Sequence, residues 1–70
     1  MMEEATKQLH DSLSPRQKEI VELVCKGLTN KEVANQLHIA EKTVKFHLTG
    51  IFLRLEVRNR TSLAAKIRGD

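Results

Sequence analysis

The sequence predicts an all-α domain of four helices. Hydrophobic residues recur at helical spacing in four segments, residues that start or end helices flank these segments, and no stretch shows the alternation of a half-buried strand. With 70 residues, three Gly and one Pro, the chain is expected to fold around one small core. Such a core leaves little room for a deep substrate cleft, and no nucleophile, base and orienting group share a face. We therefore do not expect an enzyme.

The first helix is expected at residues 15–26. Ser14 and Gln17 have the spacing of a capping box, and Pro15 occupies the first helical position. Gly27 supplies the left-handed residue that commonly ends a helix.

The next two helices are expected to form a helix-turn-helix at about residues 30–49. Thr29 and Glu32 repeat the capping box and start a short second helix. A three-residue turn, in which Ile39 is the apolar plug, leads into a longer helix at residues 41–55.

This longer helix has two chemically different faces. One stripe is apolar and is expected to lie in the core: Val44, Leu48, Ile51 and Leu55. The opposite face carries Lys42, Phe46, Thr49 and Leu53, with Lys45 at its edge. Phe46 would be out of place on a face that meets only water, whereas Leu53 is expected to pack under the N-terminal arm or the last helix.

Two positions weaken the same helix. Ala40 offers no side-chain acceptor at the cap position, which Glu41 partly offsets through the helix dipole. Gly50 costs about 1 kcal/mol relative to Ala in a helix interior, and it either permits a close backbone approach or is a tolerated defect.

A fourth helix is expected at residues 60–68, with Asn59 as its cap. Its apolar line consists of Leu63, Ala64 and Ile67. At the other end of the chain, residues 1–12 lack a strong period and are expected to form a flexible arm in front of a domain at residues 13–68.

The net charge of +3 is unevenly distributed. Residues 1–24 hold three basic and five acidic side chains, whereas residues 41–68 hold seven basic and two acidic ones. The positive part of the chain is therefore where a polyanionic partner is expected to bind.

Other compositional features exclude several kinds of site. Cys25 is the single cysteine, so no internal disulfide is possible and a reducing cytoplasm is the expected compartment. It is expected to be a small apolar filler, with a redox sensor as the alternative. His10 and His38 lack partners at metal-ligand spacing, so we expect neither a metal nor a cofactor. The chain also lacks a signal-peptide pattern and a run long enough to cross a membrane, so no membrane partner is expected.

A small basic helical domain with a helix-turn-helix is expected to bind double-stranded DNA through the longer helix of that motif, at residues 41–55. The side chains expected to reach base edges in the major groove are Lys42, Lys45, Phe46 and Thr49. Those expected to lie near phosphates are Thr29, Asn30 and Lys31 at the start of a helix, with Arg58 and Arg60 adding positive charge. The alternative, motivated by Phe46, Leu53 and the modest charge, is a protein-interaction module that docks on another regulator or on RNA polymerase.

Four segments in this order and spacing resemble the LuxR-type helix-turn-helix domain of bacterial transcription regulators. They are Leu13-Ser14-Pro15-Arg16-Gln17, Gly27-Leu28-Thr29-Asn30-Lys31-Glu32-Val33-Ala34, Leu37-His38-Ile39-Ala40-Glu41-Lys42-Thr43-Val44-Lys45-Phe46-His47 and Val57-Arg58-Asn59-Arg60-Thr61. The resemblance covers about residues 13–68. Departures from the usual pattern include Ala40 in place of Ser, Gly50 in place of Asn and Glu56 in place of Gly or another small residue.

The resemblance implies a four-helix bacterial regulator domain that binds short inverted repeats near promoters as a homodimer through its fourth helix. The expected interface residues are Leu63, Lys66 and Ile67. It also implies base contacts from the positions named above and adds Thr43 and His47 to the residues near the DNA backbone. Many relatives carry a sensing domain in front, so the chain is expected to be either a stand-alone regulator or the effector domain of a longer one.

Overall fold

The computed structural model describes residues 11–69, and the helices that lie wholly within this range match the predicted all-α class. They are α2 (Pro15–Cys25), α3 (Asn30–Leu37), α4 (Glu41–Leu55) and α5 (Arg60–Arg68). Most of the arm expected at residues 1–12 lies outside the described residues.

Helix α2 ends one residue earlier than predicted. Lys26 is its C-cap, with a backbone N–H that donates to the carbonyls of Glu22 and Leu23. Gly27 then turns left-handed at φ +96°, as predicted, and directs the chain toward α3.

The predicted side-chain caps are present at three helix starts. The Ser14 hydroxyl accepts from the Gln17 N–H at 3.1 Å, and the Thr29 hydroxyl accepts from the Glu32 N–H at 3.1 Å. In both cases the side chain three residues on accepts from the backbone N–H of the cap residue, which completes the capping box. Asn59 caps α5 by accepting from the Ser62 N–H at 2.8 Å.

The Glu32 carboxylate accepts from both the backbone N–H and the side chain of Thr29, and these hydrogen bonds lower the pKa of Glu32. A lowered carboxyl pKa stabilises the folded state above the pKa of the unfolded chain. This contribution is lost as the pH falls through the folded value.

Two helix ends use left-handed residues that the sequence does not signal. His38 ends α3 and Glu56 ends α4, each with φ +57°. Both side chains are exposed, so they meet no packed neighbours, but the local strain between each β-carbon and its own backbone remains. The helix-turn-helix therefore turns through a histidine rather than through a glycine.

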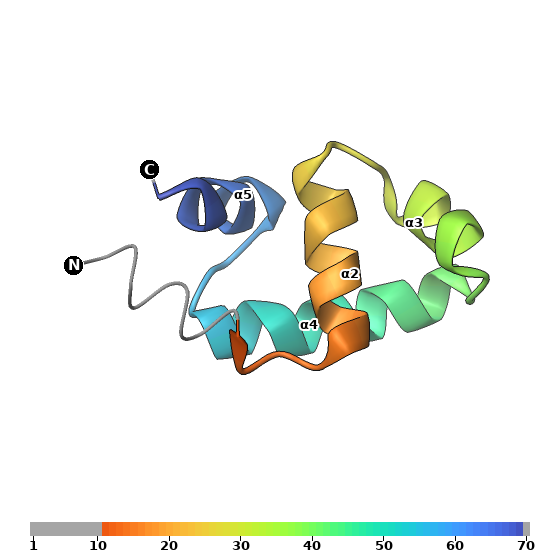
Figure 1. Ribbon diagram of the computed structural model, residues 1–70, viewed down its shortest axis with the longest axis horizontal. Coiled ribbons are helices and arrows are strands. Elements are labelled where there is room, and N and C mark those ends of the chain that lie inside the picture. Colours follow the sequence, from red (N-terminus) through yellow and green to blue (C-terminus); the bar gives the residue numbers. More distant parts are fainter. Residues whose placement is uncertain (1–10, 70) are drawn as a thin grey trace.

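Helix α4 forms the base of the molecule, and α2 crosses it (Figure 1). Helices α3 and α5 lie on opposite sides of α2, and α2 packs against each of the other three. The predicted stripe of α4 is buried, with Val44, Ile51 and Leu55 fully inaccessible to solvent. The rest of the buried core consists of Leu13, Ile20, Val21, Leu23, Val24, Val33, Ala34, Leu48 and Leu63.

Several half-buried side chains close the edges of this core. Ile39 packs against it from the turn between α3 and α4, as expected of the apolar plug. Cys25 also packs against the core, and burial raises the pKa of its thiol despite the opposing charge of Arg68. A raised pKa keeps this cysteine in the poorly nucleophilic thiol form at neutral pH.

Gly50 is the position at which we expect a substitution to stabilise the fold. A β-carbon added there would meet only the side-chain nitrogen of Gln17, at 3.7 Å, which is ordinary van der Waals contact. Gly50→Ala should therefore raise the free energy of unfolding by about 1 kcal/mol, because Ala has the higher helix propensity. Urea denaturation of both proteins measures this difference. A destabilised variant would show instead that α4 needs the close approach that glycine permits.

Candidate nucleic-acid interface

The outer face of α4 is exposed along its length. Phe46 and Leu53 are each 77% exposed, and Lys42, Lys45 and Thr49 are also exposed. All of the residues predicted to reach base edges therefore lie on one accessible face. Leu53 does not pack under α5, contrary to expectation, and the expected arm falls mostly outside the described residues.

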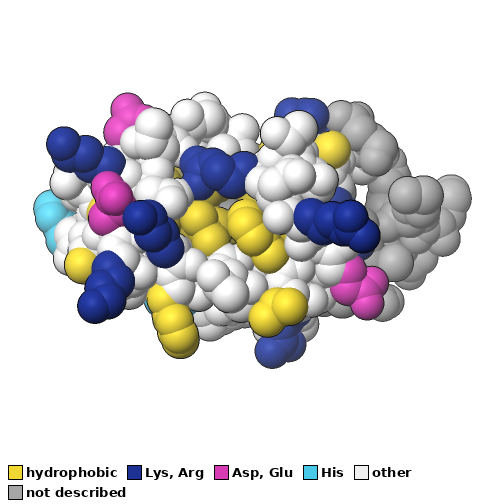
Figure 2. Space-filling model, turned by 180° about the vertical axis from the view of Figure 1, so that it is seen from behind, with side chains coloured by type: hydrophobic (Ala, Val, Ile, Leu, Met, Phe, Trp, Pro, Cys, Tyr) yellow, Lys and Arg dark blue, Asp and Glu magenta, His cyan; other side chains and the backbone are white. Residues whose placement is uncertain are grey.

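Basic side chains extend across one broad side of the molecule, and hydrophobic side chains protrude at its lower edge (Figure 2). Because this side combines positive charge with apolar groups, it can attract phosphates and also contact base methyl groups.

Two local contacts, one hydrogen bond and one ring contact, lie in the middle of this face. The Thr49 hydroxyl donates to the Lys45 carbonyl at 3.1 Å, which leaves its oxygen able to accept a second hydrogen bond. The His47 ring lies edge-on to Phe46, with centroids 6.1 Å apart, so the histidine lies at the flank of the exposed phenyl ring. Thr43 and His47, expected near the DNA backbone, are half-buried.

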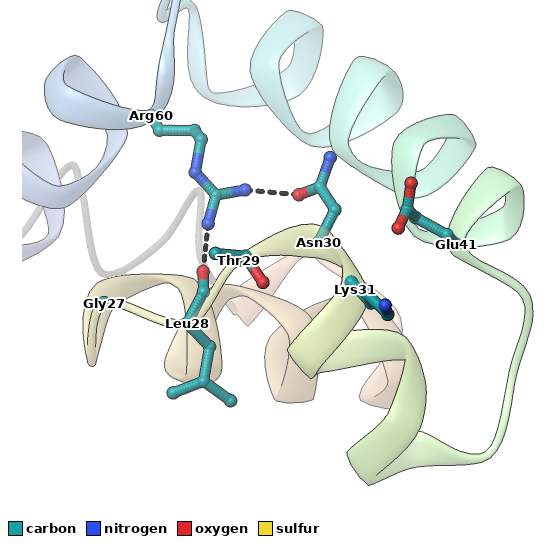
Figure 3. Close-up of a pocket in the computed structure, with 7 residues that line it drawn as sticks. All are labelled: Gly27, Leu28, Thr29, Asn30, Lys31, Glu41 and Arg60. Atoms are coloured by element: carbon teal, nitrogen blue, oxygen red, sulfur yellow. Dashed lines mark hydrogen bonds between the residues drawn. The ribbon is translucent and has the colours of Figure 1, made fainter.

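A second group of predicted residues surrounds a hollow of about 450 Å³ at the start of α3 (Figure 3). The cap residue Thr29 lines it together with Asn30 and Lys31 of α3, Glu41 of α4 and Arg60 of α5. Gly27 and Leu28 complete the lining. The α3 residues expected near phosphates are therefore brought beside the first turn of α4.

Arg60 connects α5 to this hollow. Its guanidinium donates to the side-chain oxygen of Asn30 and to the backbone carbonyl of Leu28 (Figure 3). Arg60 and Asn30 were predicted as separate phosphate neighbours, but part of their hydrogen-bonding capacity is used on each other. Arg58, in contrast, is exposed. No local sequence pattern signals these bonds, because the partners of Arg60 lie 30 positions (Asn30) and 32 positions (Leu28) earlier in the chain.

We expect Arg60→Ala to lower the free energy of unfolding by about 1–2 kcal/mol, because two hydrogen bonds are lost and a half-buried carbonyl loses its partner. Arg58→Ala is the matched control, since it removes the same charge from an exposed position and should change stability by less than about 0.5 kcal/mol. Chemical denaturation of both variants tests this difference. Equal stabilities would mean that the Arg60 bonds contribute nothing to the fold.

An ion pair that the sequence reasoning did not identify lies beside the basic face. The Lys45 ammonium is 3.8 Å from a carboxylate oxygen of Glu41, one helical turn earlier. Their side chains are 64% and 46% exposed, respectively. The i,i+4 spacing of a glutamate and a lysine is the sequence signal for such a pair, in addition to the effect of Glu41 on the start of the helix.

The residues predicted for a dimer interface are not equally available. Leu63 is completely buried in the core of the chain itself, so its side chain has no surface to offer a second copy. Lys66 and Ile67 are half-buried on α5. Only these two of the three predicted residues can take part in such a contact without a rearrangement of the core.

Residues 11–69 contain neither a cluster of metal-ligating side chains nor a helix fit to span a membrane. No three His, Cys, Asp or Glu side chains in this range lie close enough together to hold a metal ion. None of the helices in this range combines the length and the apolar character needed to cross a membrane.

Comparison with known proteins identifies the family. Residues 11–67 match the GerE family model, which represents the bacterial regulatory proteins of the luxR family. The transcriptional regulatory protein LiaR of Bacillus subtilis is 47% identical over 55 residues, which are 79% of this chain and 26% of LiaR. The putative HTH-type transcriptional regulator YhjB of Escherichia coli is 49% identical over 53 residues, covering 76% of this chain and 26% of YhjB.

Two response regulators extend the comparison. VraR of Staphylococcus aureus is 44% identical over 54 residues, which are 77% of this chain and 26% of VraR. The solved structure of the response regulator StyR superposes with a TM-score of 0.87 at 36% identity, over 96% of this chain and 34% of that one. The chain thus spans about a quarter of the length of the curated relatives named here. It belongs to the luxR family of bacterial regulatory proteins and has the fold of their LuxR-type helix-turn-helix domain.

Proposed function

We propose that the chain is the output domain of a bacterial transcription regulator and binds promoter DNA with α4 in the major groove. The observation that carries this proposal is the exposed outer face of α4, where lysines flank an outward-facing Phe46. A groove about 12 Å wide admits one helix, and its floor presents acceptors to lysine and methyl groups to an apolar ring. This role places the chain in the bacterial cytoplasm, associated with the nucleoid.

Within this proposal the two groups of residues have different roles. Lys42, Lys45, Phe46 and Thr49 read base edges from α4. Thr29, Lys31 and Arg58 hold the DNA backbone, with Thr43 and His47 beside them, and these contacts set the register without reading sequence. Asn30 and Arg60 contribute mainly through the hydrogen bond that joins them.

We further propose that two copies bind an inverted repeat, with Lys66 and Ile67 of α5 at their interface. The half-burial of both side chains supports this arrangement, because each leaves part of its surface for a second copy. Sedimentation of the chain with and without a two-site duplex tests it. A single copy on that duplex at saturating protein would contradict it.

The test of DNA binding is a titration of labelled duplexes at several salt concentrations, followed by fluorescence anisotropy. Binding should weaken as salt rises, and each phosphate neutralised should add about 0.9 to the slope of log K against log salt. Absence of binding to any duplex at low salt would contradict the proposal.

A second candidate function, docking on another regulator or on RNA polymerase, is favoured by one observation. Leu53 is 77% exposed at the far end of the face that carries Phe46. NMR shift mapping separates the two functions. Shifts in α4 on adding DNA support the first, whereas shifts confined to the surroundings of Leu53 on adding RNA polymerase support the second.

A further inference from the structure

Glu41 is an acidic residue placed among the basic side chains of the proposed DNA surface. Its carboxylate pairs with Lys45 at 3.8 Å and lines the same hollow as Lys31 and Arg60 (Figure 3). A carboxylate in this position repels phosphates, so it lowers the affinity for DNA in general. The proposed function does not by itself explain why an acid lies here.

The contribution of Glu41 to the stability of the fold explains only in part why an acidic residue stands at this position. The negative charge of Glu41 interacts favourably with the positive N-terminal end of the α4 dipole. This helps the start of the helix, because the cap residue Ala40 forms no side-chain hydrogen bond. Its pair with Lys45 is exposed, and exposed i,i+4 pairs contribute little to stability. Glu22 of α2 and its C-cap residue Lys26 form a similar exposed i,i+4 pair, 3.4 Å apart, so the chain contains a matched pair outside the proposed DNA surface.

The chemistry of the pair on α4 suits the edge of one base pair. Lys45 offers donors only, and the ionised carboxylate of Glu41 offers acceptors only. In the major groove a G·C pair presents guanine O6 and N7 as acceptors and cytosine N4 as a donor. Guanine O6 and cytosine N4 are hydrogen-bonded to each other and hence about 3 Å apart. The 3.8 Å between the two charged groups of the protein is comparable with this spacing.

We propose that Glu41 is a specificity-determining residue that reads one G·C base pair together with Lys45. Lys45 donates to the guanine and Glu41 accepts from the N4 amino group of its cytosine. On other sequences the carboxylate faces phosphates or base acceptors without compensation, and binding is weakened. This inference rests on the proposed function, because it requires α4 to lie in the major groove.

The experiment selects bound duplexes from a randomised library with the full chain and with Glu41→Gln, Glu41→Asp and the control Glu22→Gln. Dissociation constants are then measured on the selected site, on that site with each base pair changed, and on random duplex. Thermal unfolding of each variant reports separately on the start of α4.

We expect Glu41→Gln to bind random duplex about two- to five-fold more tightly, because one exposed like charge is removed. At a single G·C position it should lose about five-fold or more of the discrimination against other base pairs. Glu41→Asp keeps the charge near the helix start, so it should keep the thermal midpoint but lose base preference at that position because its side chain is shorter. Glu22→Gln should leave both DNA readouts unchanged.

The outcomes separate this inference from the proposed function. If the unmodified chain binds no duplex, the proposed function fails and this inference fails with it. If the chain binds a specific site and Glu41→Gln changes only the thermal midpoint, the proposed function holds and this inference is overturned, because Glu41 then serves only the start of the helix. The double variant Glu41→Gln with Lys45→Ala should discriminate at that position no worse than Lys45→Ala alone, since the pair acts as one unit. A further loss would contradict the joint reading.

Discussion

Ile51→Ala should lower the free energy of unfolding by about 2–5 kcal/mol, the range for removing a large aliphatic side chain from a core. Ile51 is completely buried on the stripe of α4 that faces the rest of the core. A domain of this length has a total stability of only about 3–10 kcal/mol, so the variant should unfold many degrees below the unmodified protein. Thermal unfolding followed by circular dichroism measures the shift.

The control for this prediction lies on the same helix. Leu53 is an aliphatic residue of the same size, but it is 77% exposed. Leu53→Ala should change the free energy of unfolding by less than about 0.5 kcal/mol. Similar losses in the two variants would mean that α4 is packed differently from the arrangement described above.

Lys45→Ala should cost about 1–3 kcal/mol of binding free energy on the specific site and relax the base preference there. The reason is that a base-edge contact is lost, whereas a phosphate contact would weaken binding to all sequences alike. Anisotropy titrations on the specific site and on random duplex, at two salt concentrations, separate these effects. An equal loss on both duplexes would assign Lys45 to a phosphate.

Lys26→Ala is the matched control, because it also removes a lysine from an exposed i,i+4 pair with a glutamate, at the end of α2 rather than on α4. Any effect of losing a local ion pair or one positive charge should appear in both variants. A change of base preference should appear only in Lys45→Ala. Comparable relaxation in the control would show that global charge, and not the position of Lys45, governs the preference.

The helix starts and the core stripe of α4 were predictable because their causes are local in sequence. A capping box spans four residues, so Ser14 with Gln17 and Thr29 with Glu32 can be recognised without a structure. The stripe that contains Ile51 follows from the 3.6-residue period alone. The same period correctly placed Phe46 on the exposed side.

The features that were missed depend on the backbone or on contacts between distant residues. His38 and Glu56 adopt left-handed conformations that both residue types adopt less readily than glycine, so the residue types alone do not predict them. The apolar line of α5 places Leu63 in the core, but its complete burial, which leaves it no surface for a dimer contact, depends on how α5 packs against α2. The partners of Arg60 lie in another part of the chain.

Those Arg60 bonds have a consequence for synthesis of the protein. Leu28 and Asn30 leave the ribosome about thirty residues before Arg60, so these two bonds cannot form until Arg60 has been synthesised. A fragment that ends before residue 60 therefore contains the α3 and α4 segments, but the start of α3 has only its local capping box and lacks the Arg60 bonds. In such a fragment the helix-turn-helix motif is present in sequence, whereas the link that Arg60 makes between α5 and the start of α3 is not.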